Sequence, residues 1–589
     1  MDSFEDFAYQ PLRHESEIRL LTLAPQTSAN TPLNCTLSHV LLPEAPRYIA
    51  LSYHWGDPAM TTTIKVNGTD LRVTINLEAA LRRLGTDRES FMGTDQEFFI
   101  WADALCINQT DNQEKGLQVP KMRTIFKKAS EVAVWLGKEH DIDETSIKCL
   151  YTETAPGIDR DTCLSTFPIF TRLLGRPYWR RVWIIQELAV AAHIRLYCGR
   201  YPIPWQAIDS NCNCCQNGHP ADENVSRFIM LRDIRADWLN RRPIYLLDAL
   251  HRTRSSSATD ERDKIFALLG LAWDREYFIP APSYMGTFSD TFTDFATSLL
   301  KSNEPLDFIY LRIANREVDG LLPSWVPDWT DLDDPVAHRQ FDYIMLHVSH
   351  KSRRAYDGAE ITFSGPELNA KCVLFDTVDG LGTALTSDGD ASAHETATPD
   401  EPAYPYKSQD EISHIVYQTL ASTEMFPASQ CKTLDSMPSD LYRIWRIGSV
   451  QLEEMMPTTA SHNLSNSICT WLAENRSFKV HGQTIEYWTK TWSKLPNETD
   501  SVQNEHRFFN TIRSRMRLLM TKSGHLGWAH PQTRKGDKIA VLFGCSRPVI
   551  LRAYQAGYRI AGDACLSGQS IRDLREMAID EEVENVRIL

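Results

Sequence analysis

The sequence lacks the motifs and segments that mark several large classes of protein. It has no glycine-rich phosphate loop of the form GxxxxGK(S/T) or GxGxxG, so we expect no nucleotide cradle of either type. No apolar stretch approaches the roughly 20 residues that a membrane-spanning helix needs, and the first residues, MDSFEDFAYQPLRHE, form no secretion signal. We therefore expect a cytoplasmic protein without a membrane span.

Positive charge is scarce, and the cysteines show no pairing pattern. The 62 Lys and Arg residues are outnumbered by 77 Asp and Glu residues, which gives a net charge of −15, and no basic block interrupts this balance. Because binding to nucleic acid relies on clustered basic side chains that neutralise phosphates, we expect no nucleic-acid partner. The 13 cysteines are scattered and odd in number, which favours reduced thiols over a disulfide framework.

One group of cysteines resembles a metal site only superficially. Cys212, Cys214, Cys215 and His219 follow the pattern C-x-C-C-x3-H, and adjacent cysteines fit the C-x2-C spacing of a zinc site poorly. We therefore predict ordinary thiols here, and no metal.

The stretch from Phe98 to Leu136 organises the first half of the chain. It consists of an apolar run that ends in Asp103, a polar turn, an amphipathic helix and a second apolar run. The flanking runs, residues 98–101 and 132–136, are nearly free of charge, as is typical of parallel strands covered by helices on both faces. Ligands bind such sheets at the carboxyl ends of the strands, where Asp103 and the polar residues Asn108 and Gln109 would lie.

A second buried strand is predicted over Tyr48 to Tyr53, and polar and aromatic residues follow it directly. Ser52, Tyr53, His54 and Trp55 lead into a turn at Gly56. A structural reading of this end, in which Trp55 covers the core and Gly56 makes the turn, stays open beside a functional one. Downstream, Asn67-Gly68 predicts a type I′ hairpin between residues 62–66 and 71–75, and Asn76 is expected to cap a helix over 77–84.

The segment RPYWRRVWIIQELAVA, which begins at Arg176, predicts one helix that carries a carboxylate among apolar neighbours. Trp183 and Glu187 are four residues apart and share a helix face, with Arg180 one turn earlier. A carboxylate in such surroundings is costly unless it is paired or used. Two readings of Glu187 remain: a functional group, or an ion-pair partner of Arg180 or Arg181. Asp103 likewise has a structural alternative as a cap of the next turn.

At 589 residues and 42% hydrophobic content, the chain has room for about two to four domains. We predict strands in residues 1–45, an α/β domain with a helical extension over 46–335 whose core motifs occupy 48–190, and an α+β region over 336–589. The last region contains an acidic, disordered loop over 380–412, helices near 440–455 and 503–520, and a β-rich tail over 538–560.

Three blocks of this sequence resemble those of the fungal heterokaryon incompatibility (HET) domain. They are YIALSYHWGDP, IWADALCINQ with Glu114 downstream, and RPYWRRVWIIQE, in the expected order between Tyr48 and Glu187. The resemblance continues through DERDKIFALLGLA, LPSWVPDW and a tail like GDKIAVLFGCSRPVILR. It implies a role in fungal nonself recognition and programmed cell death, with self-association on activation and a partner incompatibility protein.

Parts of the same blocks are also similar to Toll/interleukin-1-receptor (TIR) domains. Leu51-Ser52-Tyr53 resembles the TIR strand that ends in I-S-Y, residues 100–103 resemble the strand that ends in aspartate, and residues 183–188 resemble W-C-x-x-E-L, with Ile184 in place of the cysteine. This resemblance implies a TIR/flavodoxin-like parallel sheet flanked by helices, and it nominates Glu187 as the catalytic residue of an NAD-cleaving enzyme that needs no bound cofactor. The remaining candidate site residues are Ser52, Tyr53, Trp55, Gly56, Asp103, Asn108, Gln109, Arg180 and Trp183.

The chemistry so implied is simple. Nicotinamide leaves NAD as a neutral base, so the enzyme has to stabilise only the oxocarbenium-like ribose, as one carboxylate does in glycosidases. Asp103 and Asn108 could bind ribose or phosphate, and Trp55 or Trp183 could stack on a base. The alternative is a non-enzymatic HET module, in which these motifs form a surface for like domains or signalling partners.

Overall fold

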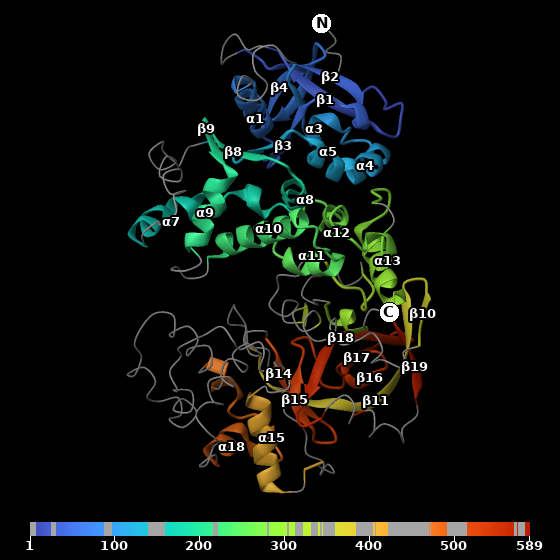
Figure 1. Ribbon diagram of the computed structural model, residues 1–589. Coiled ribbons are helices and arrows are strands. Elements are labelled where there is room, and N and C mark those ends of the chain that lie inside the picture. Colours follow the sequence, from blue (N-terminus) through green and yellow to red (C-terminus); the bar gives the residue numbers. More distant parts are fainter. Residues whose placement is uncertain are drawn as a thin grey trace. The chain divides into compact units, whose positions relative to one another are not determined.

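The computed structural model of the chain forms two compact units, residues 1–291 and 292–589 (Figure 1). This division lies before the boundary that the sequence predicted after residue 335. The residues that the structure describes are 7–24, 31–87, 97–138, 160–215, 222–279, 282–302, 306–311, 322–330, 340–341, 344, 360–384, 405–406, 408–421, 470–471, 473–491, 515–569, 574 and 583–589.

The described part of the first unit contains a nine-stranded sheet in the order β5-β4-β2-β1-β6-β3-β7-β8-β9. Its strands are β1 (Glu17–Leu23), β2 (Asn34–Leu41), β3 (Tyr48–Tyr53), β4 (Thr61–Val66), β5 (Thr69–Thr74), β6 (Phe99–Trp101), β7 (Glu131–Trp135), β8 (Ile194–Cys198) and β9 (Tyr201–Pro204). The four central strands β6, β3, β7 and β8 are parallel to one another. All six residues of β3 are buried, as expected for a parallel strand covered on both faces.

The sheet as a whole is mixed, so the prediction of a parallel sheet holds only for its centre. β1 pairs antiparallel with both β2 and β6, and β8 pairs antiparallel with β9. β4 and β5 are antiparallel because a two-residue turn joins them, in which Asn67 and Gly68 both have positive φ, 52° and 84°. The strands predicted within residues 1–45 are therefore inner strands of the same sheet.

Helices cover both faces of the central strands. On one face, α1 (Ile75–Thr86) buries Leu77 and Leu81 in one cluster with Leu51 of β3. On the other face lie α3 (Asp103–Cys106), α4 (Asn112–Gln118), a 3₁₀ turn (Val119–Lys121) and α5 (Met122–Lys128). There the Tyr48 hydroxyl donates a hydrogen bond of 2.6 Å to the carbonyl oxygen of Ile125. This arrangement, with helices on both faces of the sheet, agrees with the predicted α/β class.

The cap of α1 differs from the prediction. Thr74 is the N-cap, and its hydroxyl accepts a hydrogen bond from the amide of Leu77. Asn76 lies inside the first turn, where its side-chain amide donates to the carbonyl oxygen of His54 and its Oδ1 accepts from Trp135 Nε1 at 2.8 Å. Asn76 therefore ties the turn after β3 to the neighbouring strand β7.

The rest of the first unit is helical. Its elements are α7 (Arg160–Leu174), a 3₁₀ turn (Pro177–Arg180), α8 (Trp183–Ala189), α9 (Trp205–Cys215), α10 (Glu223–Leu239), α11 (Leu246–Arg252) and α12 (Asp263–Leu269). None of the helices in the described ranges is long and apolar enough to cross a membrane. Across those ranges no cluster of three or more His, Cys, Asp or Glu side chains could hold a metal ion.

The second unit begins within α13 (Phe288–Lys301) and contains a largely antiparallel sheet. Its strands are β10 (Ile361–Ser364), β11 (Glu367–Leu381), β14 (Arg517–Thr521), β15 (Leu526–Ala529), β16 (Lys538–Leu542), β17 (Val549–Tyr554), β18 (Gly557–Leu566) and β19 (Glu584–Ile588), and two of its helices are α15 (Gln409–Ala421) and α18 (Ile485–Thr491). The β-rich tail agrees with the prediction. The helix predicted near 503–520 is wrong over residues 517–520, which form β14.

Two predictions for the second unit lie wholly or mainly outside the described residues. The helix near 440–455 is one, and the loop over 380–412 is the other, since only its ends are described, in β11 and α15.

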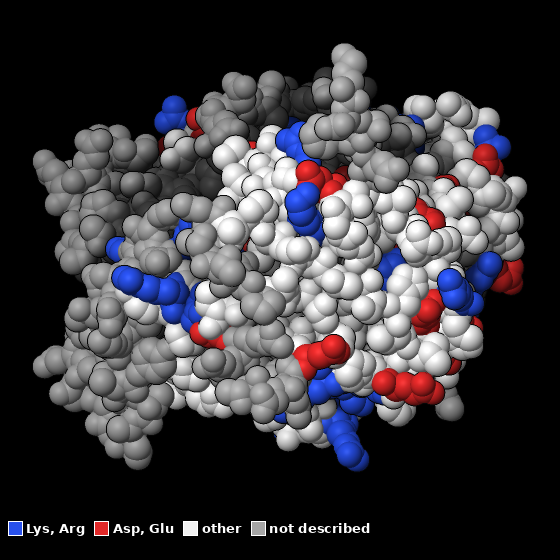
Figure 2. All heavy atoms as spheres, turned by 90° about the horizontal axis from the view of Figure 1, so that it is seen from above, with Lys and Arg blue, Asp and Glu red and all other residues white. Residues whose placement is uncertain are grey.

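On the face that Figure 2 shows, Lys and Arg side chains are interspersed with Asp and Glu, and those described form no continuous basic field.

Candidate functional site

The helix that carries Glu187 begins later than the sequence predicted. Residues 177–180 form a 3₁₀ turn, Arg181 is extended with φ −69° and ψ 133°, and α8 starts only at Trp183. The cause is a pairing with another segment: the backbone amide of Ser257 donates to the carbonyl oxygen of Arg180, and Val182 donates to that of Ser257. Arg180 is therefore exposed and not on the Glu187 helix, which corrects its predicted placement.

Glu187 lies against the end of β3. The Ser52 hydroxyl donates a hydrogen bond to Glu187 Oε2, and the same hydroxyl is 2.7 Å from the hydroxyl of Tyr178. The Glu187 side chain is only 2% exposed. The carboxylate thus meets a strand-end serine 135 residues away in sequence.

Burial raises the pKa of Glu187 to about 7. The nearby charge of Arg181 and the Ser52 hydrogen bond lower this pKa, and the carboxylate of Asp103 raises it further. Among the described residues, no arginine nitrogen lies within ion-pair distance of Glu187. Glu187 therefore bonds the Ser52 hydroxyl instead of the predicted arginine partner, and the Arg181 guanidinium lies farther away.

Asp103 and Tyr53 extend the cluster. Asp103 Oδ2 accepts a hydrogen bond of 2.9 Å from Trp55 Nε1, and Asp103 Oδ1 accepts one of 2.7 Å from the amide of Ala104. Tyr53 is buried, and within the described residues its hydroxyl has no hydrogen-bond partner at standard geometry. Burial raises the Tyr53 pKa well above its ordinary value, and the carboxylates of Asp103 and Glu187 add to this effect. Asp103 is the first residue of α3 and not its N-cap, which is Ala102, so the predicted cap is wrong; its carboxylate contributes charge to the site.

The turn after β3 is held from several sides. The Arg181 guanidinium donates to the carbonyl oxygen of Tyr53, and the amide of Gly56 donates to His54 Nδ1 at 3.1 Å. Gly56 has a φ of +83°, a conformation that L side chains rarely adopt. Trp55 remains 40% exposed. Gly56 therefore lets the chain turn after β3, and Trp55 presents an aromatic surface beside Asp103.

Trp183 contacts a second carboxylate, the partly buried Asp263, which was not among the predicted site residues. Its Nε1 donates to Asp263 Oδ2 at 2.8 Å, and the Tyr284 hydroxyl donates to Asp263 Oδ1 at 2.7 Å. Burial raises the Asp263 pKa to about 6, although these two bonds lower it. Asp263 stands just before the apolar run of DERDKIFALLGLA, and its position in that block was the available signal.

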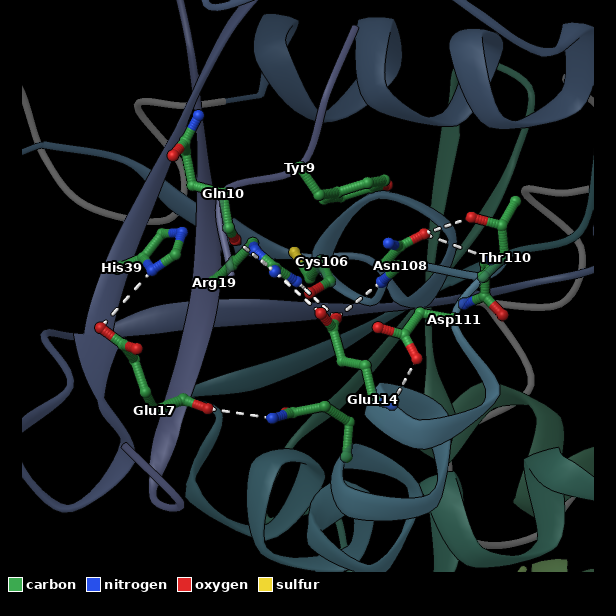
Figure 3. Close-up of polar contacts among 12 residues, drawn as sticks. Tyr9, Gln10, Glu17, Arg19, His39, Cys106, Asn108, Thr110, Asp111 and Glu114 are labelled. Atoms are coloured by element: carbon green, nitrogen blue, oxygen red, sulfur yellow. Dashed lines mark hydrogen bonds and ion pairs between the residues drawn. The ribbon is translucent and has the colours of Figure 1, made fainter. Parts of the chain in front are cut away.

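Asn108 and Gln109 shape the loop after β6. Asn108 Oδ1 accepts hydrogen bonds from the amide and hydroxyl of Thr110, and Gln109 Nε2 donates to the carbonyl oxygen of Asp103 at 2.9 Å. The close-up in Figure 3 places Asn108 beside Thr110 and Glu114. Both residues therefore support the backbone around Asp103, and the contacts of Asn108 are within its own loop.

A buried ion pair anchors this loop to β1 (Figure 3). Both nitrogens at the end of Arg19 bond to the Glu114 carboxylate, at 2.6 and 2.9 Å, and they also donate to the carbonyl oxygens of Cys106 and Gln10. The Glu114 carboxylate also accepts from the amide of Asn108 at 2.8 Å. Arg19 is fully buried. This pair could not be predicted, because a lone arginine in an apolar strand looks like a solvent-facing residue.

Comparison with known proteins identifies the part of the chain that holds this cluster. Residues 48–187 match the family model described as Heterokaryon incompatibility protein (HET). The chain is also 26% identical over 413 residues to Heterokaryon incompatibility protein 6, OR allele, of Neurospora crassa, a match that covers 56% of this chain and 60% of that protein.

The chain thus matches less than two thirds of the length of that relative. No solved structure matches, so the TIR-like or flavodoxin-like topology stays a prediction. The matched region starts at Tyr48, the first residue of β3, and ends at Glu187, so it includes both halves of the Ser52–Glu187 contact. Residues 48–187 of this chain therefore form a HET domain.

Proposed function

We propose that this protein acts in heterokaryon incompatibility, as an effector in fungal nonself recognition whose activation leads to programmed cell death. The family match over residues 48–187 and the similarity to the Neurospora heterokaryon incompatibility protein support this role. On this proposal the protein is cytoplasmic, self-associates on activation and responds to a partner incompatibility protein.

The chemistry that the site supports best is hydrolysis of NAD. The carrying observation is the Glu187 carboxylate, which is buried, held by Ser52 and flanked by Tyr53 and Asp103. In the reaction the bond between ribose C1′ and the nicotinamide nitrogen breaks, and its electron pair leaves with neutral nicotinamide. Water then bonds to C1′ and releases a proton to solvent, which yields ADP-ribose.

Glu187 would act through its charge. The ribose becomes oxocarbenium-like as nicotinamide departs, and a carboxylate in water-poor surroundings stabilises that positive charge more strongly than one in bulk water. Ser52 orients the carboxylate by donating to Oε2. Asp103 would bind a ribose hydroxyl, and the exposed ring of Trp55 would stack on a base.

Access to Glu187 requires a rearrangement, because the side chain is 2% exposed. The segment after β3 reaches solvent, since Trp55 is 40% exposed. We therefore expect little activity in the isolated chain and more when chains associate and this segment shifts. Such a requirement would suit an effector that stays harmless until cells fuse.

The test uses the purified full-length chain, free and forced to oligomerise, incubated with NAD while nicotinamide release is followed. We expect release from the assembled chain, and loss of it in Glu187→Ala and Glu187→Gln. Glu78→Gln is the matched control, since Glu78 lies on α1 in a surface pair with Arg82. Activity that survives Glu187→Ala would remove the residue assignment, and inactivity in every assembly state would remove the enzyme.

A non-enzymatic interaction module is the second candidate, and the burial of Glu187 favours it. A carboxylate that is satisfied by Ser52 and shielded from solvent also serves to fix α8 against β3. On this reading, Glu187→Gln keeps the hydrogen bond and retains cell death in a fungal host, whereas on the enzymatic reading it abolishes death while the protein still folds.

A further inference from the structure

The two edge strands of the nine-stranded sheet, β9 and β5, differ in what they offer to a further strand. At the β9 edge, the carbonyl oxygen of Tyr197 accepts from the amide of Leu136 on the β7 side, so the residue paired with Tyr197, Pro202, faces away from β8. Pro204, two residues along β9, faces the same way. Because proline has no N–H to donate, the β9 edge is poorly suited to a further strand.

The β5 edge has no proline and keeps its outward amides. On the neighbouring strand β4, the Lys65 amide donates to the carbonyl oxygen of Leu33 at 2.8 Å and so points away from β5. The backbone groups of Asp70, which is paired with Lys65, therefore point away from β4, and those of Arg72 point the same way. Across the described ranges these outward N–H and C=O groups form no hydrogen bond. Unpaired groups of this kind are a template for another strand.

The side chains at these two positions carry opposite charges, in an order that is complementary to itself. Asp70 and Arg72 share one face of the sheet, whereas Leu71 between them packs on the other face against the core. If two copies of β5 pair antiparallel around Leu71, each Asp70 lies opposite the Arg72 of the other copy. The outward backbone groups of these two residues then face one another as a hydrogen-bonded pair. The charge order and the direction of the backbone groups therefore specify the same register.

The contacts that Asp70 and Arg72 make within one chain are compatible with this pairing. Lys65 Nζ lies 2.7 Å from Asp70 Oδ1, and the two side chains are 46% and 37% exposed, so this ion pair is weak. Arg72 Nε donates to the neutral hydroxyl of Thr61 at 3.1 Å, and within the described part of the chain Arg72 has no carboxylate partner. Lys65 and Thr61 both belong to β4, on the inner side of β5. The outer side of both charged residues is left for another strand.

We propose that the β5 edge is a self-association surface, to which a second copy of this chain adds its own β5 antiparallel, across a two-fold axis at Leu71. The same patch serves both copies, as a two-fold interface requires. A strand of six residues gives a small contact, so we expect a weak dimer that forms where chains are concentrated. The proposal rests on the self-association in the proposed function, but it requires neither NAD nor Glu187.

The first test is sedimentation equilibrium of the full chain. We expect a dimer with a dissociation constant below about 1 mM, weakened about tenfold or more by Asp70→Arg or by Arg72→Asp, since each change sets two pairs of like charges opposite one another. An equal mixture of these two variants should associate again, because every pair then joins opposite charges; this recovery also shows that both variants are folded. Lys127→Glu reverses an exposed charge on α5 and is the matched control.

The second test places a cysteine at the proposed axis. In Leu71→Cys the two introduced thiols would lie on Cα atoms about 4.5 Å apart, within the range of a disulfide, so mild oxidation should give a covalent dimer. In the control Thr69→Cys the two Cα atoms would be roughly 14 Å apart at 3.4 Å per residue, and no such dimer should form.

The outcomes separate this surface from the proposed enzyme. Glu187→Gln should associate as the native chain does, even where NAD cleavage is lost. Association that is unchanged by both charge reversals would overturn the location, and cross-linking at position 69 as readily as at position 71 would overturn the register. A native chain that stays monomeric, together with no covalent dimer of Leu71→Cys, would end the proposal.

Discussion

Replacement of Glu187 by glutamine should stabilise the folded chain at high pH and leave its stability nearly unchanged at low pH. Glutamine keeps the size of the side chain and an oxygen that accepts from Ser52, but it carries no charge to bury. In the native protein the pKa of Glu187 is raised from 4.5 to about 7, chiefly by burial. The folded state therefore binds this proton more tightly than the unfolded state does.

The sign and size of the effect follow from that difference in proton binding. Below pH 4.5 the group is protonated in both states and imposes no penalty. Between pH 4.5 and about 7 the unfolded chain loses the proton first, so the free energy of unfolding falls as pH rises. Above about pH 7 the full penalty applies, about 3 kcal/mol at roughly 1.4 kcal/mol for each pH unit of the interval.

The measurement is urea unfolding of the native chain and Glu187→Gln, followed by tryptophan fluorescence at pH 5 and pH 8.5. We expect the difference in unfolding free energy between the two proteins to grow by about 3 kcal/mol in favour of glutamine from the lower to the higher pH. Asp263 and Asp307 also have raised pKa values, but both proteins contain them, so their effects cancel. A difference that stays constant with pH would refute the buried, proton-binding carboxylate.

Three further predictions concern the same unit. Arg19→Met should lower the free energy of unfolding by about 3–5 kcal/mol, because it leaves the Glu114 carboxylate without its partner. In the same urea assay, the double variant Arg19→Met/Glu114→Leu should recover most of that loss, and a single variant as stable as the native chain would contradict this prediction. Gly270→Ala should lower the free energy of unfolding by about 1–3 kcal/mol, since its added Cβ would lie 1.7 Å from the side-chain oxygen of Gln186 on α8. Gly85→Ala is the control: its added Cβ would have its nearest atom at 3.4 Å, so the melting temperature should hardly change. If the ionised carboxylate stabilises the ribose cation, kcat/KM for NAD should rise with pH to a plateau, with a midpoint near the Glu187 pKa of about 7. A kcat/KM that falls over the same pH range would contradict the role of the carboxylate.

The centre of the sheet could be predicted because its strands are continuous apolar runs. Residues 48–53, 98–101 and 132–136 have no periodic polar positions, and such runs occur where helices cover both faces of a parallel sheet. The same runs place Ser52 near the carboxyl end of β3, beside the parallel strand β7. Local patterns were sufficient there.

Contacts between segments that are far apart in the chain could not be predicted. An apolar strand such as β1 does not indicate its partner, and its pairing with β6 depends on the whole sheet. The break before α8 is set by the carbonyl oxygens of Arg180 and Ser257, which bond across the chain and override the helical pattern of the segment. Tyr178 joins Ser52 only because that break directs its 3₁₀ turn toward β3.

The pairing of β1 bears on where the functional unit begins. The family match starts at Tyr48, yet β6 of the matched region has β1 as one of its two neighbours, and the loop that carries Asp103 is tied by Glu114 to Arg19 of β1. A domain cut at Tyr48 would expose the apolar edge of β6 and leave the Glu114 carboxylate without its arginine, and both changes are strongly destabilising. The strand from Glu17 to Leu23 is therefore part of the site's support, and the smallest unit that can hold Asp103 beside Glu187 includes it.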